Sequence, residues 1–504
     1  MAIEQTTLHW KKQDTVRSLF AFVGHFFLLI LITAILLLSD KFSNLKDDFA
    51  KNGSYYLYAL FCMALLVCIL YFYFFFENKN VLASGKNITL VFALLDLYVI
   101  IAYLFGKYLS IYARPVAFVA LMSFVLIGRK EAIFLNIISA LFLFVIDTFA
   151  VDTTTAIEGY SSLIISFSAG MLTIFFCEKA KTRVWIVIIG MIIVIPIDFV
   201  ILLLGSSSII AQSGKFTFEG EGWQIIFTNM GYGFLGGVMS TVFFLTILPI
   251  FEGIFNCLTV FRLRELTSPD AKVLKKLKEE APGTYIHSMM VAQLAEASAA
   301  AIGEDVDYAR AAAMYHDVGK MHHPDYFTEN QGDYNLHDDL LPELSADMIR
   351  SHAKDGAMVI RSNHLPDFLA DIALQHHGTL PIRYFYAKAL KLTDGELNIE
   401  DFSYLGPKPQ SRIAAIIMIA DAAEAVVRAN NSKSPELAEK AIRTIIEERM
   451  DLEQFSECNI TMVDLTKIRM ALVDALTGVH HHRIKYPNIK YKHSEDGTTK
   501  GENV

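Results

Sequence analysis

The sequence predicts an all-α protein: a helical bundle that spans a membrane several times, followed by an all-helical domain outside the lipid. Of the 504 residues, 53% are hydrophobic and 12% aromatic, and the mean hydropathy is positive, which exceeds what an ordinary soluble protein of this length carries. The long apolar runs end near residue 255, whereas 13 of the 15 histidines follow that point. The membrane half therefore comes first.

Eight apolar spans are expected in the membrane half, because about 20 apolar residues are needed to cross a ~30 Å hydrocarbon core. They cover residues 18–39, 55–76, 88–105, 113–128, 131–150, 160–177, 183–204 and 230–252. The fourth is short, and a re-entrant path there would leave seven. The first is too long for a secretory signal peptide and has no small-residue cleavage pattern, so we expect it to remain as an anchor.

Charge in the loops predicts the orientation. Basic residues precede the first span and occur in the loops "ENKNVLASGKN", "GRKE" and "EKAKTR", which fall on one side if there are eight spans. By the positive-inside rule both the N-terminus and the second half are cytoplasmic, in a bacterial-type cell membrane. Three carboxylates, Asp96, Asp147 and Asp198, lie within spans, where such groups are often functional, but two of them are near predicted span ends, so a transport or proton-relay role is not favoured.

The expected domains are a cytoplasmic N-terminus (1–17), a transmembrane region (18–252), a helical connector (253–282), a helical catalytic domain (283–485) and a polar tail (486–504). Apolar residues at helical spacing predict helices at 284–302, 306–319, 344–360, 367–377, 411–430, 434–449 and 463–477. The net charge is −9 and basic stripes are missing, so a nucleic-acid polymer is excluded as a partner. Five scattered cysteines form neither a zinc motif nor a disulfide framework.

Several helices of the second half carry ionisable side chains where a core residue is expected. Asp421, for example, interrupts the apolar run "RIAAIIMIADAAEAVV", where an unpaired carboxylate would cost several kcal/mol. Imidazoles and carboxylates are the usual ligands of divalent Fe, Mn or Zn, and an aspartate can bridge two ions. A two-metal site needs about six or seven protein ligands. Seven candidates occur in the order H, HD, H, HH, D: His287, His316, Asp317, His352, His376, His377 and Asp421.

Each histidine has a structural alternative when taken singly. A helix-borne histidine is more often a hydrogen-bonded core residue than a ligand, and His376 and His377 could act as cations at a helix C-terminus before Gly378. The ordered set in one domain favours the metal site. The remaining histidines of this half, among them His337 and His364, lie in polar or loop-like contexts and are interpreted as surface or supporting residues.

The motifs "EAPGTYIHSMMVAQLAEASAAAIG", "YHDVGKMHHPDYFTENQ", "HAKDG", "QHHGT" and "GPKPQSRIAAIIMIADAAEA" carry a resemblance to a known family. The second half resembles the HD phosphohydrolase superfamily and looks like the seven-transmembrane HD proteins of the PgpH type. This resemblance implies hydrolysis of cyclic-di-AMP to linear pApA at a site with two divalent ions, Fe or Mn. A cyclic dinucleotide is then the implied partner, and a homodimer is left open.

The family pattern also implies roles for individual residues. His287, His316, Asp317 and Asp421 would hold one ion, and Asp317 would bridge to a second ion held by His352, His376 and His377. Lys320, in "HDVGK", matches a position expected to meet a phosphate, although it could also extend toward solvent from a helix end. Asp317 and Lys320 are therefore the expected catalytic residues.

The sequence departs from related patterns in two places. The double histidine is followed by "GTLPIRYFY" instead of the Gly-Tyr-Pro of cyclic-di-GMP enzymes, which argues against that substrate. PgpH-type proteins place a large extracytoplasmic domain after the first span, whereas only "DKFSNLKDDFAKNGS" is found here, so the sensor is expected to be missing. The alternatives are an HD hydrolase of another nucleotide, such as an alarmone, and a membrane receptor that binds a nucleotide without turnover.

Overall fold

The computed structural model describes residues 12–38, 45–149, 156–180, 182–213, 221–392, 395–430 and 434–478. Its elements are helices, and in these residues extended backbone pairs only at an isolated bridge between Pro381 and Ser403. The chain divides into two compact units, Met1–Arg262 and Leu263–Val504. The predicted fold class, an all-α protein with a membrane bundle before a helical domain, is confirmed.

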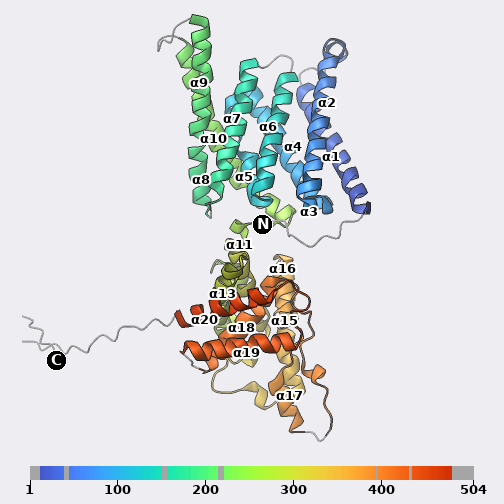
Figure 1. Ribbon diagram of the computed structural model, residues 1–504, viewed down its shortest axis with the longest axis vertical. Coiled ribbons are helices and arrows are strands. Elements are labelled where there is room, and N and C mark those ends of the chain that lie inside the picture. The colour runs from blue at the N-terminus through green and yellow to red at the C-terminus, as the bar shows by residue number, and fades with distance from the viewer. Residues whose placement is uncertain are drawn as a thin grey trace, which may run out of the picture. The chain divides into compact units, whose positions relative to one another are not determined.

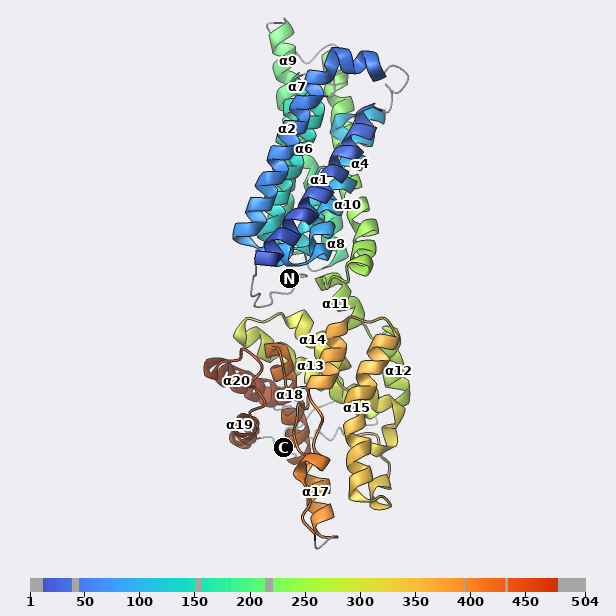
Figure 2. The same ribbon diagram turned by 90° about the vertical axis from the view of Figure 1, so that its right-hand side faces the viewer.

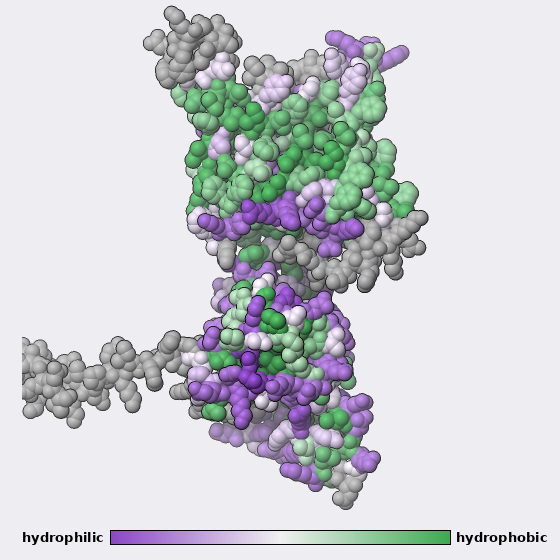
Figure 3. Space-filling view, viewed as in Figure 1, coloured by the Kyte–Doolittle hydropathy of each residue, from purple (hydrophilic) through white to green (hydrophobic). Residues whose placement is uncertain are grey.

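The first unit is a bundle of helices that are apolar on nearly all sides (Figure 1). Figure 3 shows the result on one face of this unit, where hydrophobic side chains cover most of the surface and a hydrophilic band borders them. Such helices are stable in lipid because each satisfies its own backbone hydrogen bonds. Its helices are α1 (Lys12–Leu38), α2 (Leu45–Glu77), α3 (Lys79–Ala83), α4 (Gly85–Tyr108), α5 (Phe118–Leu126), α6 (Arg129–Phe149), α7 (Ala156–Cys177), α8 (Arg183–Ile192), α9 (Val194–Ser213) and α10 (Glu221–Ile254).

Seven helical segments in the described residues are long and apolar enough to cross a membrane, in place of the eight expected. The difference lies in the fourth predicted span, where the chain forms a 3-10 turn, Ile111–Ala113, and the nine-residue α5. This broken segment still leads the chain back along the bundle. Arg114 contacts the carbonyl of Ala102 in the last third of α4, whereas Glu131, at the start of α6, accepts a hydrogen bond from Asn78 beside α3.

The second helix begins earlier than the sequence pattern predicts. The segment from 45 to 54, expected to be part of a polar loop, forms the first turns of α2, with Asp47 and Asp48 in the first turn. Carboxylates there are favoured by the positive end of the helix dipole, and this stabilises a helical extension that hydropathy alone does not detect. Residues 39–44 lie outside the described part of the chain.

One of the three carboxylates within the spans is held by a buried ion pair. The guanidinium of Arg114 donates to both oxygens of Asp147, at 2.6 and 2.7 Å, and its Nη1 also donates to Ser162. Gly106 leaves room for this group, since a Cβ there would lie 2.5 Å from an Arg114 nitrogen. Asp147 therefore has a structural partner, as charges in a bilayer normally do.

The second unit is a helical domain built around α13. It packs against α14, α18 and α20, and the first half of α18 is almost completely buried, as for Ile416 and Ile419. In both ribbon views α17 lies at one end of the unit (Figures 1 and 2). Its helices are α11 (Val260–Leu266), α12 (Lys272–Glu280), α13 (Pro282–Ile302), α14 (Val306–Tyr315), α15 (Pro342–Ser362), α16 (Asp367–Gln375), α17 (Arg383–Leu390), α18 (Arg412–Asn430), α19 (Pro435–Asp451) and α20 (Met462–Gly478), with the 3-10 helix η3 (Val318–His322).

Candidate metal centre

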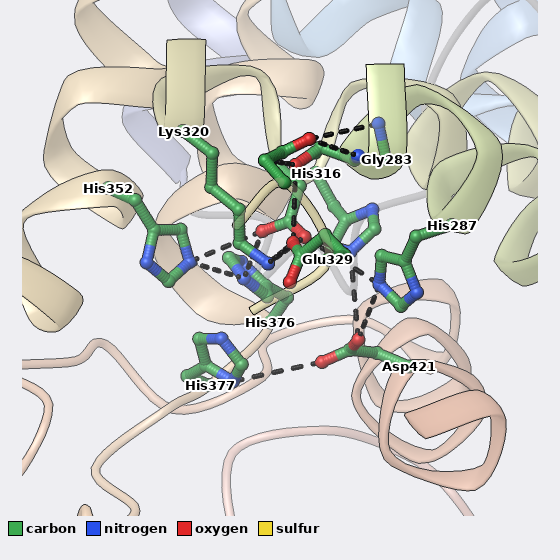
Figure 4. A network of polar contacts seen from close by, with 12 residues as sticks. Gly283, His287, His316, Lys320, Glu329, His352, His376, His377 and Asp421 are labelled. Carbon is green, nitrogen blue, oxygen red and sulfur yellow. Dashed lines mark hydrogen bonds and ion pairs between the residues drawn. The ribbon is translucent and has the colours of Figure 1, made fainter. Parts of the chain in front are cut away.

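The seven predicted ligands come from five segments of the second unit that meet inside it (Figure 4). His287 lies within α13, His352 lies within α15, and Asp421 lies in the middle of α18. The others stand at helix ends: His316 and Asp317 between α14 and η3, and His376 and His377 directly after α16. Five of the seven side chains are at most 4% exposed, whereas Asp421 is 14% and His377 22% exposed.

The ligand atoms form two groups. His287, His316 and Asp317 offer atoms that all lie within 4.8 Å of one another, and so do His352, His376 and His377. Both groups consist of neutral-donor or carboxylate side chains that bind divalent transition metals. The geometry is therefore that of two adjacent candidate cation sites.

Asp317 lies between the two groups. Its Oδ2 is 3.6 Å from Nε2 of His287 and 3.3 Å from Nε2 of His316, while its Oδ1 is 3.3 Å from Nε2 of His352 and 3.6 Å from Nε2 of His376. Each carboxylate oxygen thus faces a different group. An aspartate in this position can bridge two ions.

Asp421 spans the same pair of groups from the side of α18. Its Oδ1 is 3.0 Å from Nε2 of His287 and 3.8 Å from Nε2 of His316, and its Oδ2 is 3.9 Å from Nδ1 of His377. Asp421 is a carboxylate in an otherwise apolar stretch of α18. All seven predicted residues are therefore brought together.

Backbone carbonyls fix the tautomers of three histidines. The Nδ1 atoms of His316, His352 and His376 donate to the carbonyls of Ala313, Ile349 and Ala373 at 2.6, 2.6 and 2.8 Å. A carbonyl only accepts, so the proton of each neutral ring is on Nδ1 and the lone pair of Nε2 faces the centre. This is the arrangement that metal-binding histidines require.

Unpartnered atoms in the centre show that the residues fit cations. Nε2 of His352 and Nε2 of His376 lie 3.1 Å apart, although each ring donates from its other nitrogen, so two lone pairs face each other. Nε2 of His316 and Oδ1 of Asp317 are buried without a hydrogen-bond partner among the described residues, while Oδ2 of Asp317 has the Lys320 ammonium at 2.7 Å. Buried polar atoms in this state are costly, and divalent ions between them would remove that cost.

Protonation in the centre follows from burial and charge. Burial lowers the pKa of His352 to about 3, so this ring stays neutral at physiological pH. For Asp317 and Asp421 burial acts to raise the pKa, but neighbouring histidines, and Lys320 in the case of Asp317, hold the pKa of both carboxyls well below the usual value. For His316 burial acts to lower the pKa, yet the two carboxylates raise it to about 10, so a metal ion would displace a proton there.

Lys320 points into the centre. Its Nζ is 2.7 Å from Oδ2 of Asp317 and 2.8 Å from Oε1 of Glu329, and its side chain is 12% exposed. The alternative that this lysine extends toward solvent is therefore wrong.

Sequence reasoning missed three residues around the ligands. Glu424, one turn after Asp421, contacts Nδ1 of His287 through Oε2 at 2.7 Å, and it was detectable as a second acidic residue in an apolar helix. Tyr404 stacks on the ring of His377 with centroids 4.3 Å apart. Glu329 contacts Lys320. For Tyr404 and Glu329 the sequence offers no periodic signal, because both lie outside helices.

The other histidines of the second half do not enter the centre. His322 and His323 are exposed and His364 lies after the end of α15. His337 is not a surface residue, contrary to the first of the two interpretations above. It is 5% exposed, and its Nε2 is 2.9 Å from the carbonyl oxygen of Tyr326. His480, His481 and His482 lie outside the described residues.

Fold and site together define a multi-pass membrane protein that carries a helical domain with a histidine- and aspartate-rich centre. Residues 54–259 match the family described as 7TM receptor with intracellular HD hydrolase, and residues 284–426 match the HD domain. Both matches agree with the resemblance that the sequence motifs indicated, to seven-transmembrane proteins with an HD hydrolase domain.

Curated relatives are similar over most of the chain. It is 36% identical over 464 residues to "Cyclic-di-AMP phosphodiesterase PgpH" of Listeria monocytogenes serotype 1/2a (strain 10403S), covering 89% of this chain and 61% of the relative. It is 37% identical over 441 residues to the protein of the same name from Bacillus subtilis (strain 168), covering 86% of this chain and 60% of the relative. The chain thus spans about three fifths of the length of these relatives.

One solved structure, the L. monocytogenes phosphodiesterase PgpH HD domain in complex with cyclic-di-AMP, is 48% identical, with a TM-score of 0.41. The match covers 42% of this chain and 99% of that one.

Proposed function

We propose that the chain is a membrane-anchored, metal-dependent phosphodiesterase that hydrolyses cyclic-di-AMP to linear pApA. The observation that carries this proposal is the position of Asp317, whose two oxygens face two separate groups of buried ligands. Two relatives that are 36% and 37% identical bear the name cyclic-di-AMP phosphodiesterase, which supports the substrate. The first half of the chain, with its seven apolar helical spans, provides the anchor.

The residues of the centre would hold two divalent ions. His287, His316, Asp317 and Asp421 surround the first position, and His352, His376 and His377 share Asp317 at the second. When bound, such a pair of ions lowers the pKa of water and neutralises charge on a phosphate. Imidazole and carboxylate donors suit Fe and Mn, which are the ions we propose.

The surrounding side chains prepare the site. Glu424 orients the ring of His287 through Nδ1, and the backbone carbonyls orient His316, His352 and His376. Lys320 donates to a non-bridging oxygen of the phosphate that is being cleaved, where negative charge grows in the transition state. Asp317 and Lys320 therefore have the catalytic roles.

The substrate offers two equivalent phosphodiesters, and hydrolysis of one of them opens the ring. Water adds to phosphorus, the bond to the departing 3′ oxygen breaks, and that oxygen takes up a proton. The product keeps one phosphodiester and gains a 5′-phosphate, which is pApA. A covalent nucleophile on the protein is not required.

We propose that the second unit lies in the cytoplasm, where the nucleotide is. The end of the bundle that carries Asn78 and Glu131 also carries the Arg129–Glu178 ion pair. Exposed basic residues gather at that end: Lys79, Lys86, Arg129, Lys130, Lys179 and Arg183. By the positive-inside rule it faces the cytoplasm, and the chain leaves α10 there because the 3-10 turn Ile111–Ala113 and α5 lead it back once. We also propose that the chain forms a homodimer, because two-fold dimers are the commonest closed homo-oligomers. Mass photometry in lipid nanodiscs distinguishes a dimer from a monomer.

Product analysis tests the proposal. The full chain in nanodiscs is incubated with Mn²⁺ and cyclic-di-AMP, and separately with cyclic-di-GMP or a guanosine alarmone, and products are resolved by liquid chromatography. We expect pApA from the first nucleotide and little turnover of the others. Turnover of another nucleotide in preference would favour a different HD hydrolase, and tight binding of cyclic-di-AMP without a product would favour a receptor.

A further inference from the structure

A buried ammonium beside the metal centre has two acidic neighbours. Nζ of Lys320 lies 2.7 Å from Oδ2 of Asp317 and 2.8 Å from Oε1 of Glu329, and 4.9 Å from the centroid of the Phe327 ring. Asp317 is 1% exposed and the Glu329 side chain 9%. Figure 4 shows Lys320 and Glu329 directed toward each other across the edge of the ligand set.

Glu329 is itself fixed to the start of α13. Thr284 donates its hydroxyl to Oε1 of Glu329 at 3.2 Å and accepts a hydrogen bond from Nδ2 of Asn330 at 2.8 Å. The side-chain oxygen of Asn330 in turn accepts from the backbone N–H groups of Gly283 and Thr284 at 2.9 and 3.2 Å. A Cβ on Gly283 would lie 1.9 Å from the carbonyl oxygen of Glu329, so the two backbones are in direct contact. His287 belongs to the same helix.

The two neighbours of Lys320 have different fates once ions are bound. Asp317 would give its oxygens to the ions, and the ions would repel the ammonium. Glu329 lies outside both groups of ligands, so its carboxylate remains available to Lys320. A charge-assisted hydrogen bond of this length is among the stronger polar contacts in proteins.

We propose that Glu329 is the positioning residue that keeps the Lys320 ammonium at the metal centre and directs it toward the substrate phosphate. This inference rests on the proposed function, because it assigns Lys320 to a phosphate. Glu329 acts through Lys320 alone, without touching substrate or metal. The contacts of Glu329 and Asn330 with the start of α13 hold the Glu329 carboxylate at a fixed position relative to His287, which belongs to the same helix.

A double-mutant cycle tests the proposal on the full chain in nanodiscs. Glu329→Gln keeps the size of the side chain and its ability to accept from Thr284, but removes the charge. It is compared with Lys320→Ala, with the double variant and with Glu343→Gln, an exposed glutamate at the start of α15, as the control. Three quantities are measured: bound Mn²⁺ per chain, kcat and KM for cyclic-di-AMP, and the Kd for inorganic phosphate of the Mn²⁺-loaded chain by calorimetry.

We expect Glu329→Gln to lower kcat and to weaken phosphate binding, each roughly ten- to a hundredfold, as for loss of a hydrogen bond to a charged group, with Mn²⁺ content unchanged. In the Lys320→Ala background the same substitution should change neither quantity further. A tenfold loss that persists in that background, a fall in Mn²⁺ content, or wild-type values in Glu329→Gln would each overturn the proposal. If the wild-type chain leaves cyclic-di-AMP intact, the proposed function fails, while the phosphate-binding cycle still decides the role of Glu329.

Discussion

Asp317 is the residue on which both ligand groups depend. It follows His316 at the point where α14 ends and η3 begins, and its side chain is 1% exposed between four imidazoles and Lys320. Asp317 lies within 3.6 Å of histidines of both ligand groups, whereas Asp421, which also spans the two groups, is 3.9 Å from His377. The consequences of removing it can therefore be stated sharply.

Asp317→Ala should abolish binding of two ions and reduce turnover of cyclic-di-AMP by more than about a thousandfold, because metal activation of water and charge neutralisation are lost together. Elemental analysis and product formation are measured on the same preparation in nanodiscs. Asp325→Ala, at an exposed aspartate in the following 3-10 turn, is the matched control and should behave as wild type. An Asp317→Ala chain with wild-type turnover would refute the site assignment.

Glu424 supports the site from behind His287. Glu424→Gln should weaken Mn²⁺ binding by about 10- to 100-fold, because the ring loses the carboxylate that orients it and raises its basicity. Calorimetric titration of the chelator-treated chain measures this. Glu447→Gln, exposed on α19, serves as the control. An affinity equal to that of the control would show that Glu424 is dispensable.

At this scale the candidate ligands could be singled out because each lies within an apolar helical pattern, as Asp421 does in α18, or at the end of one, as His376 does after α16. The contacts that support them could not. Glu329 and Tyr404 lie in irregular segments, where no periodicity relates a residue to the fold, so their contacts with Lys320 and His377 could not be predicted from the sequence. Only tertiary packing reveals such pairs.

Among the elements, η3 and α15 determine how closely the two ligand groups approach. Gly319 of η3 faces Gly356 of α15, and a Cβ on Gly319 would lie 2.0 Å from the carbonyl oxygen of His352. The close approach of these backbones places Asp317 beside His352. Helix packing at glycine thus controls the spacing within the centre.

Gly319→Ala should therefore force the two elements apart and lower the free energy of unfolding by ~1–3 kcal/mol, as overpacking does, with loss of bound Mn²⁺. Gly332→Ala, where nothing lies within 4 Å of the added Cβ, should change stability by less than ~0.5 kcal/mol. Thermal unfolding followed by fluorescence compares the two. Equal transition temperatures and equal Mn²⁺ content in the two variants would contradict the claim that the contact of η3 and α15 at Gly319 sets the spacing of the centre.

The helices themselves were largely predictable, since the apolar period identified α13, α15, α16, α18, α19 and α20. The helix expected at 306–319 ends at Tyr315, before the 3-10 helix η3, and α17 was not expected. Two elements of the membrane half also differ, for physical reasons. The fourth predicted span has enough apolar residues, but Pro115 cannot donate a backbone hydrogen bond, and Arg114 turns inward to Asp147, so a full-length helix does not form. The start of α2 is polar, and hydropathy underestimates its length.

For the whole molecule, the account requires the chain to enter and leave the bundle at the same end. Reporter fusions after residues 82, 180 and 260 should report the cytoplasm, and fusions after residues 42, 152 and 217 the opposite side, because the basic residues gather at the first end. Alkaline phosphatase and green fluorescent protein provide complementary readouts. A fusion after residue 260 that reports the outside would separate the second unit from a cytoplasmic nucleotide.

The central claim is that two ions, held by ligands that share Asp317, hydrolyse cyclic-di-AMP. The most direct measurement is the initial rate of pApA formation by the chelator-treated full chain as Mn²⁺ is added in known equivalents. We predict a rate near zero without metal and a rise that reaches its plateau at two equivalents per chain, since each candidate ligand group would hold one ion. A rate that is independent of Mn²⁺, or that reaches its plateau at one equivalent, would contradict the account.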